Sequence, residues 1–165
     1  MITQQLTQEL RTLSYLLHPP LLDEAGLEAA LSWYTNGFSE RSGLPIAVYV
    51  ADDLGRLAAE HEMTIFRVVQ ECMSNIHRHA AATNVEIRLW RCDRSSILEV
   101  VDDGRGIPAA VLAGCRPGEP SELGVGIAGM RERVAHLDGR FEIFTAERAG
   151  TRIRVTLPIE SGLDK

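Results

Sequence analysis

The sequence contains a single lysine, Lys165, at its last position, and all of its other basic residues are arginines. A P-loop nucleotidase needs the motif G-x-x-x-x-G-K-[ST], and a eukaryotic-type protein kinase needs a strand lysine that contacts the phosphates. Because no lysine is available for either task, both classes are excluded. Any nucleotide bound by this chain must be held by different chemistry.

Cysteines and long apolar runs are also scarce. Cys72, Cys92 and Cys115 are odd in number, widely spaced and without a C-x-x-C motif, so a disulfide framework is not indicated. No apolar run approaches the roughly 20 residues that span a bilayer, and the N-terminus lacks a signal-peptide core. We therefore expect a cytoplasmic setting with free thiols. Any membrane anchor of a full-length protein would lie in segments outside this sequence.

Positively charged residues are fewer than negatively charged ones: the net charge is −6, and no basic tract offsets it. This balance argues against a nucleic-acid partner. The 165 residues, 45% apolar and 24% charged, have the size and composition of one soluble domain with a substantial core.

Hydrophobic periodicity and turn residues predict alternating helices and strands. Helices are predicted over residues 2–17, 23–41, 59–80 and 124–137, and strands over 45–50, 85–91, 97–101, 141–145 and 151–157. Because the later strands come in adjacent pairs without a crossover between them, a wholly parallel sheet is disfavoured. We expect an α+β, two-layer sandwich with a mixed, mostly antiparallel sheet and helices on one face.

The helix that includes residues 64–80 is the centre of the functional prediction. Its apolar residues recur at three- and four-residue steps, which places them on one stripe; they are Ile65, Val68, Val69, Cys72 and Ile76. Glu71 and Asn75 lie one turn apart, and Arg78 and His79 continue that line by another turn. These polar groups could face a ligand that carries phosphates and a divalent metal. A solvated helix face is the alternative.

Three further segments carry candidate chemistry. Asp102-Asp103-Gly104-Arg105-Gly106 follows an apolar strand and is either a simple turn or a carboxylate at a strand end beside a flat base. The segment 124–129 matches G-x-G-x-x-G and opens a helix, where N–H groups favour phosphate. A proline-rich loop precedes this motif, so a Rossmann unit is rejected. Thr151 opens the last strand and could be there only as a strand former.

Together and in this order, the motifs E-C-M-S-N-I-H-R-H-A, D-D-G-R-G, G-V-G-I-A-G-M-R-E-R-V and G-T-R-I-R-V-T-L-P resemble a known family. It is the Bergerat-type ATP-binding domain of the GHKL superfamily, which joins gyrase, heat-shock chaperones, histidine kinases and mismatch-repair proteins. The resemblance covers about residues 21–159. It is greatest to bacterial sensor histidine kinases that partner helix-turn-helix response regulators, whose linker the segment L-H-P-P-L-L-D-E-A-G-L-E-A-A-L resembles.

The resemblance implies roles for the residues of the central helix. Asn75 would give its amide oxygen to Mg²⁺, which prefers hard oxygen ligands. Glu71 would act as a base or polarise the accepting group. Arg78 and His79 would face phosphate oxygens, although His79 could instead be packed internally.

The resemblance also assigns the remaining site residues. Asp102 would accept a hydrogen bond from the adenine amino group, and Thr151 would support Asp102 directly or through water. The other cofactor-binding residues implied by these motifs, around the base and the phosphates, are Gly104, Gly106, Ile107, Gly124, Gly126, Gly129 and Met130. The loop over residues 107–123 would be the ATP lid. Asp103 stands where the family often has asparagine, and Val125 where histidine is frequent.

The function implied is MgATP-dependent phosphoryl transfer to a histidine for two-component signalling. None of the five histidines has the setting of an acceptor; they are His18, His61, His77, His79 and His136. The acceptor is therefore expected in an upstream domain of a homodimeric kinase that serves a cognate response regulator. Residues 1–20 would end a dimerisation helix and linker, and residues 21–162 would form the catalytic domain. A stand-alone regulator or anti-sigma-type serine kinase of the same fold is the alternative, and a dimerisation scaffold is a third.

Overall fold

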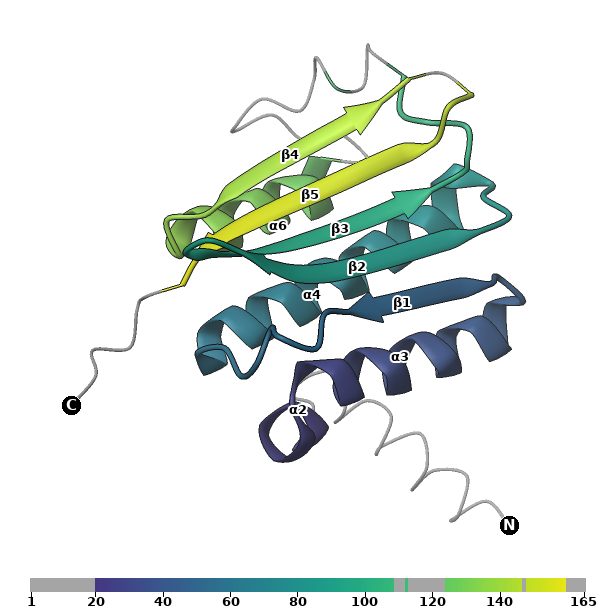
Figure 1. Ribbon diagram of the computed structural model, residues 1–165. Coiled ribbons are helices and arrows are strands. Elements are labelled where there is room, and N and C mark those ends of the chain that lie inside the picture. Colours follow the sequence, from purple (N-terminus) through teal and green to yellow (C-terminus); the bar gives the residue numbers. More distant parts are fainter. Residues whose placement is uncertain (1–19, 109–111, 113–123, 147, 160–165) are drawn as a thin grey trace, which may run out of the picture.

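The computed structural model describes residues 20–108, 112, 124–146 and 148–159 of the chain. In this part of the chain, helices cover a five-stranded sheet (Figure 1). The helices are α2 (Pro20–Ala25), α3 (Leu27–Ser42), α4 (Ala59–Asn75), the π-helix η1 (Ile76–Ala80) and α6 (Gly124–His136). The strands are β1 (Ile46–Val50), β2 (Val85–Cys92), β3 (Ser95–Asp102), β4 (Arg140–Thr145) and β5 (Thr151–Pro158).

The sheet has the strand order β1-β2-β3-β5-β4. Among the strands that the structure describes, only β1 and β2 pair in parallel, and α4 lies in the connection between them, as a parallel pair requires. The pairs β2–β3, β3–β5 and β4–β5 are antiparallel. The predicted mixed, mostly antiparallel sheet is therefore confirmed. The order also brings the end of β3 beside the start of β5, with Asp102 opposite Thr151.

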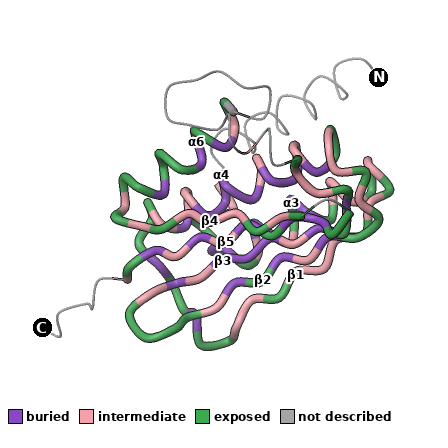
Figure 2. Tube along the Cα trace, turned by 90° about the horizontal axis from the view of Figure 1, so that it is seen from above, coloured by how far each residue is buried: buried purple, intermediate pink, exposed green. Residues whose placement is uncertain are grey.

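The helices lie on one side of the strands, as Figure 2 shows for α3, α4 and α6. Alternation of side chains along the strands explains this layering. In β2, Val85, Ile87 and Leu89 are buried against the helices, whereas Arg88 between them is exposed. The two-layer α+β architecture predicted from the sequence is confirmed.

Helix α4 contributes many of its side chains to the hydrophobic core. All five residues of the predicted apolar stripe, four in α4 and Ile76 in η1, are at most 7% exposed, and Phe66 and Met73 beside them are fully buried. Burial raises the pKa of the Cys72 thiol, so this cysteine is a neutral core residue rather than a reactive one. Cys72 and Cys92 are both free thiols, as expected, and Cys115 lies outside the described residues.

One predicted helix is divided in the structure. Residues 23–41 were expected to form a continuous helix, but α2 and α3 are separated at Gly26, whose φ is 88°. A positive φ combined with a ψ of 179° is easy for glycine alone, so the prediction of an unbroken helix is wrong at that position. The predicted helix over residues 2–17 and most of the predicted lid lie outside the described residues.

The face of the sheet away from the helices carries polar side chains. Arg154 of β5 lies opposite Glu99 of β3, and its Nε and Nη2 atoms donate to Glu99 Oε1 at 2.8 and 2.6 Å. Glu99 is only 5% exposed. The Arg154 guanidinium also covers the ring of Phe144, 5.8 Å from its centroid. A buried carboxylate on this face is thus neutralised by its cross-strand partner.

Candidate functional site

The polar margin of α4 carries Glu71 and Asn75, one helical turn apart and both half-buried. The side-chain amide nitrogen of Asn75 is buried and has no hydrogen-bond partner among the described residues. After a half-turn of the amide, its oxygen takes that position. Buried polar groups are nearly always paired in folded proteins, so a ligand that bonds to the Asn75 amide would satisfy this atom.

The helix does not continue regularly beyond Asn75. Residues Ile76–Ala80 form a π-helix, whose i→i+5 bonds widen the turn and change the direction of the following side chains. The prediction that Arg78 and His79 extend the line of Glu71 and Asn75 assumed regular α-helical spacing, and that assumption is wrong here. Arg78 is exposed and His79 is half-buried. The π-helix ends at Ala80 and is capped by Ala81, which has a φ of 51°.

Asp102 ends β3 and is only 6% exposed. Burial raises the pKa of its carboxyl, and hydrogen bonds from the backbone N–H groups of Gly104 and Thr151 partly offset that effect. The bond from Gly104 to Asp102 Oδ1 is 2.8 Å long. A buried carboxylate with donors on one side can accept a further hydrogen bond from a ligand on the other.

Thr151 contacts Asp102 through its main chain, while its hydroxyl lies 3.3 Å from the hydroxyl of Thr145. Thr145 Oγ1 also accepts the N–H of Ile107 at 2.8 Å and donates to the carbonyl of Gly150 at 3.0 Å. This threonine therefore holds the residues after the Asp102 turn against the β4–β5 hairpin. No sequence pattern pointed to Thr145, because a threonine at the end of a strand is an ordinary strand former.

The D-D-G-R-G turn is pressed against the end of the π-helix. A Cβ atom on Gly104 would lie 2.5 Å from the carbonyl oxygen of Ala80, so only glycine fits there. The N–H of Arg105 donates to that same carbonyl at 2.9 Å. Asp103 bonds to Thr83 and Asn84, which follow the π-helix. These tethers bring the predicted base-reading turn and the predicted phosphate-binding helix end side by side.

The start of α6 lies directly against Glu71. A Cβ atom on Gly126 would lie only 2.0 Å from Glu71 Oε1, so the glycine leaves the space that this carboxylate occupies. The predicted catalytic carboxylate and the G-x-G-x-x-G segment are thus brought together. Met130 has a different place, because it is fully buried and its sulfur contacts that of Cys72 at 3.9 Å.

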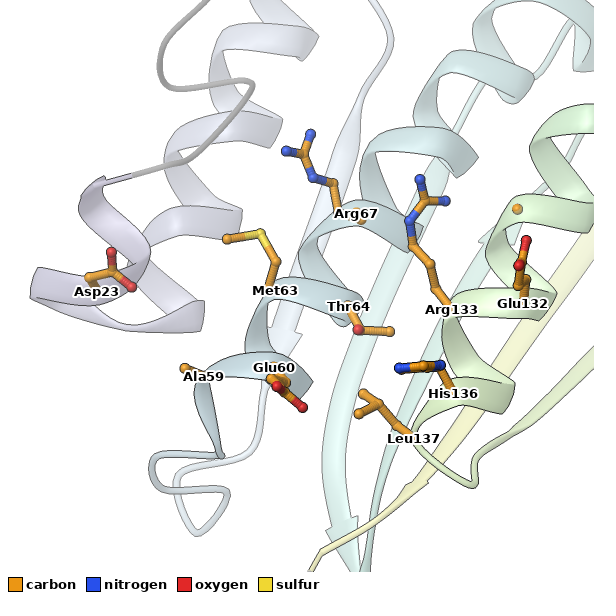
Figure 3. A pocket seen from close by; sticks show the side chains of 11 residues that line it. Asp23, Ala59, Glu60, Met63, Thr64, Arg67, Glu132, Arg133, His136 and Leu137 are labelled. Carbon is orange, nitrogen blue, oxygen red and sulfur yellow. The ribbon is translucent and has the colours of Figure 1, made fainter.

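A cleft of about 790 Å³ lies between α4 and α6 in the helical layer (Figure 3). It is lined chiefly by residues from the N-terminal half of α4 and the C-terminal half of α6. Of the predicted site residues, only Gly129 lines it. The guanidinium groups of Arg67 and Arg133 project to the same side of it, and burial together with the charge of Arg133 lowers the pKa of Arg67. The cleft is therefore separate from the site around Asn75 and Asp102.

The site combines the buried carboxylate of Asp102 at a strand end with the unpaired amide nitrogen of Asn75 on α4. The glycine-rich start of α6 lies against a second carboxylate, that of Glu71. The sequence profile described as "Histidine kinase-, DNA gyrase B-, and HSP90-like ATPase" matches residues 60–161, more than half of the chain. The chain belongs to this family.

Two curated relatives of the chain are sensor histidine kinases. MctS of Rhizobium johnstonii is 34% identical over 151 residues, which cover 92% of this chain and 32% of MctS. NarS of Mycobacterium tuberculosis is 32% identical over 159 residues, which cover 95% of this chain and 35% of NarS. The chain thus spans about a third of the length of these relatives.

Solved histidine kinase structures share the fold. The histidine kinase domain of a blue-light activated histidine kinase from Erythrobacter litoralis superposes with a TM-score of 0.62 and 24% identity, covering 81% of this chain and 61% of that one. A further structure of that kinase gives a TM-score of 0.64 and covers 82% of this chain and 42% of that one. The predicted family and fold are confirmed, while the helix-turn-helix subgroup stays a prediction.

Among the described residues, no helix is both long and apolar enough to cross a bilayer.

Proposed function

We propose that this chain is the ATP-binding catalytic domain of a sensor histidine kinase and that, within a longer protein, it supplies MgATP for phosphorylation of a histidine outside this sequence. The observation that carries the proposal is the buried, unpaired amide of Asn75 beside Glu71. Buried polar groups are usually paired in folded proteins, so this amide nitrogen is available to a ligand. The alternative of a dimerisation scaffold gives the amide no partner.

Base recognition is assigned to Asp102. Its carboxylate is held in place by backbone donors and retains acceptor capacity for the adenine amino group. Gly104 and Gly106 line the base, and Ile107 is fixed beside them by its bond to Thr145. Guanine presents a carbonyl oxygen at the corresponding edge, so two acceptors would face each other. Selectivity for ATP over GTP follows.

The phosphates and the metal are assigned to the helix side of the site. Asn75 would hold Mg²⁺ through its amide oxygen, and the metal would neutralise charge on the phosphate oxygens. Arg78 and His79 lie on the adjoining π-helix, from which cationic side chains can reach phosphate oxygens. Gly124, Gly126 and Gly129 begin α6, whose N-terminal N–H groups favour anions.

Glu71 is the general base in this proposal. The acceptor imidazole nitrogen attacks the γ-phosphorus, the bond from that phosphorus to the β–γ bridging oxygen breaks, and ADP leaves with the bond's electron pair. A proton on the attacking imidazole passes to Glu71, and the position of Glu71 one turn from Asn75 supports this role. The close approach of Gly126 leaves room for the carboxylate to keep that position.

The partners follow from the same chemistry. ATP, an upstream phosphoacceptor domain, a second copy of the kinase and a cognate response regulator are proposed partners, and use of ATP is consistent with a cytoplasmic site of action. The named relatives that share most of the chain are sensor histidine kinases, which favours this proposal over an anti-sigma-type regulator.

Calorimetric titration with ATP, with and without Mg²⁺, tests the proposal. Binding that tightens with Mg²⁺ supports it, and absence of any heat or thermal shift with nucleotide refutes it. With γ-labelled ATP, the chain alone should take up no acid-labile label, because none of its histidines has the setting of an acceptor. Transfer should appear when a dimerisation domain carrying the acceptor histidine is added. Stoichiometric label on the chain's own histidines would contradict the assigned roles.

A further inference from the structure

Asp103 has both carboxylate oxygens engaged, although it is exposed. Its Oδ1 accepts the N–H groups of Thr83 and Asn84 at 2.7 and 2.9 Å, and its Oδ2 accepts the Thr83 hydroxyl at 2.6 Å. These bonds, with the Thr83 hydroxyl contributing most, hold the pKa of this carboxyl below its usual range. The carboxylate is therefore charged at neutral pH and directed at the main chain.

These bonds connect two segments that are far apart in sequence. One is the turn of residues 102–106, which begins with Asp102. The other is the segment of residues 80–84, which leaves the π-helix carrying Arg78 and His79. The N–H of Asp103 also donates to the carbonyl of Asn84 at 3.4 Å, so the same residue joins the segments through main chain and side chain.

We propose that Asp103 is a positioning residue that fixes the base-recognising carboxylate of Asp102 relative to the π-helical end of α4. Through it, the two ends of a bound nucleotide are held at a set separation, so binding of the base pre-organises the phosphate side. This inference rests on the proposed function. Asp103 does not need to touch the nucleotide, because its engaged oxygens point to Thr83 and Asn84.

The chemistry of the three bonds separates positioning from a direct effect of charge. An asparagine at this position could reproduce all three, since its carbonyl oxygen accepts both N–H groups and its NH₂ donates to the Thr83 hydroxyl. An alanine could make none of them. Asp103→Asn should therefore behave like the parent protein, whereas Asp103→Ala should not.

The experiment compares ATP with adenosine, which offers only the base end and the ribose. For Asp103→Ala we expect ATP affinity to fall by about tenfold or more, and adenosine affinity to fall by less than about threefold. Asp103→Asn should stay within about threefold of the parent for both ligands. Asp53→Ala, which removes another exposed aspartate from a turn, is the matched control and should change neither affinity.

Amide hydrogen exchange followed by NMR gives a second readout that needs no ligand. Asp103→Ala should remove protection at Thr83 and Asn84 and leave the amides of β2 and β3 protected. Thr83→Val, which loses only the hydroxyl contact, should give an intermediate loss of ATP affinity if Asp103→Ala does not fold. Equal loss of ATP and adenosine, or Asp103→Asn as weak as Asp103→Ala, would overturn the positioning role. Failure of the parent protein to bind ATP would instead refute the proposed function.

Discussion

Replacement of Asp102 by asparagine should separate nucleotide affinity from stability. The Asp102 carboxylate has two acceptor oxygens, and Oδ1 is taken by the N–H of Gly104. An asparagine has one acceptor oxygen, so keeping the bond to Gly104 turns its NH₂ group toward the adenine amino group. Two donors then face each other. Loss of a charged hydrogen bond of this kind should weaken ATP binding by about 1–3 kcal/mol, roughly five- to 150-fold.

The same substitution should not destabilise the ligand-free protein. Burial raises the pKa of Asp102, so the folded protein keeps this proton to higher pH than the unfolded chain does. The favourable contribution of Asp102 is therefore complete below the unfolded pKa and is lost as pH rises through the folded pKa. At neutral pH the charged form opposes folding, and Asp102→Asn should leave the melting temperature unchanged or raise it.

Titration calorimetry and thermal melts from acid to neutral pH check both parts. The parent protein should bind GTP poorly. Its melting temperature should include a decrease, caused by ionisation of Asp102, as the pH rises from acid to neutral, and Asp102→Asn should lack this decrease. Equal affinity of the parent protein for ATP and GTP would refute the base-reading assignment. Unchanged ATP affinity in Asp102→Asn would refute the account of opposed donors.

Three other sites yield predictions. Asn75→Ala should abolish the Mg²⁺ dependence of ATP affinity. Glu71→Gln should leave ATP binding nearly intact and remove phosphoryl transfer to a supplied acceptor domain. Equal loss of ATP binding in both variants would contradict the separate roles assigned to Asn75 and Glu71. Gly126→Ala places a methyl group 2.0 Å from Glu71 Oε1. The rate of phosphoryl transfer should therefore fall about tenfold while ATP affinity changes less. Initial rates and calorimetry measure these two quantities. Arg154→Ala leaves Glu99 buried without its partner and should lower the free energy of unfolding by about 1–3 kcal/mol, a range reduced because Arg154 is partly exposed. An unchanged urea denaturation curve would contradict this.

Most of the fold could be predicted because local periodicity agreed with the final burial. Val85, Ile87 and Leu89 alternate in sequence and are buried in the structure, and Leu27 and Leu31 of α3 likewise face the core. Adjacent strand pairs indicated antiparallel pairing, which the structure has. The break at Gly26 could not be foreseen with equal ease, because a single glycine is tolerated within many helices.

The site was predictable in its residue types but less so in its geometry. The spacing of Glu71 and Asn75 sufficed because α4 is regular between them, whereas no local pattern predicted the π-helix after Asn75. Asp103 was noted only as a departure from a familiar motif. Its partners lie about 20 positions earlier in the sequence, and only the folded chain places them beside it.

The strand order leaves β1 and β4 as the two edges of the sheet, and these edges differ in how well they resist association. Arg140 and Glu142 place charges along β4, and such charges discourage a foreign strand from pairing. The β1 sequence I-A-V-Y-V has no charge, and Tyr49 is 59% exposed. Of the two sheet edges in the described part of the chain, β1 is therefore the one at which we expect intermolecular strand addition to begin.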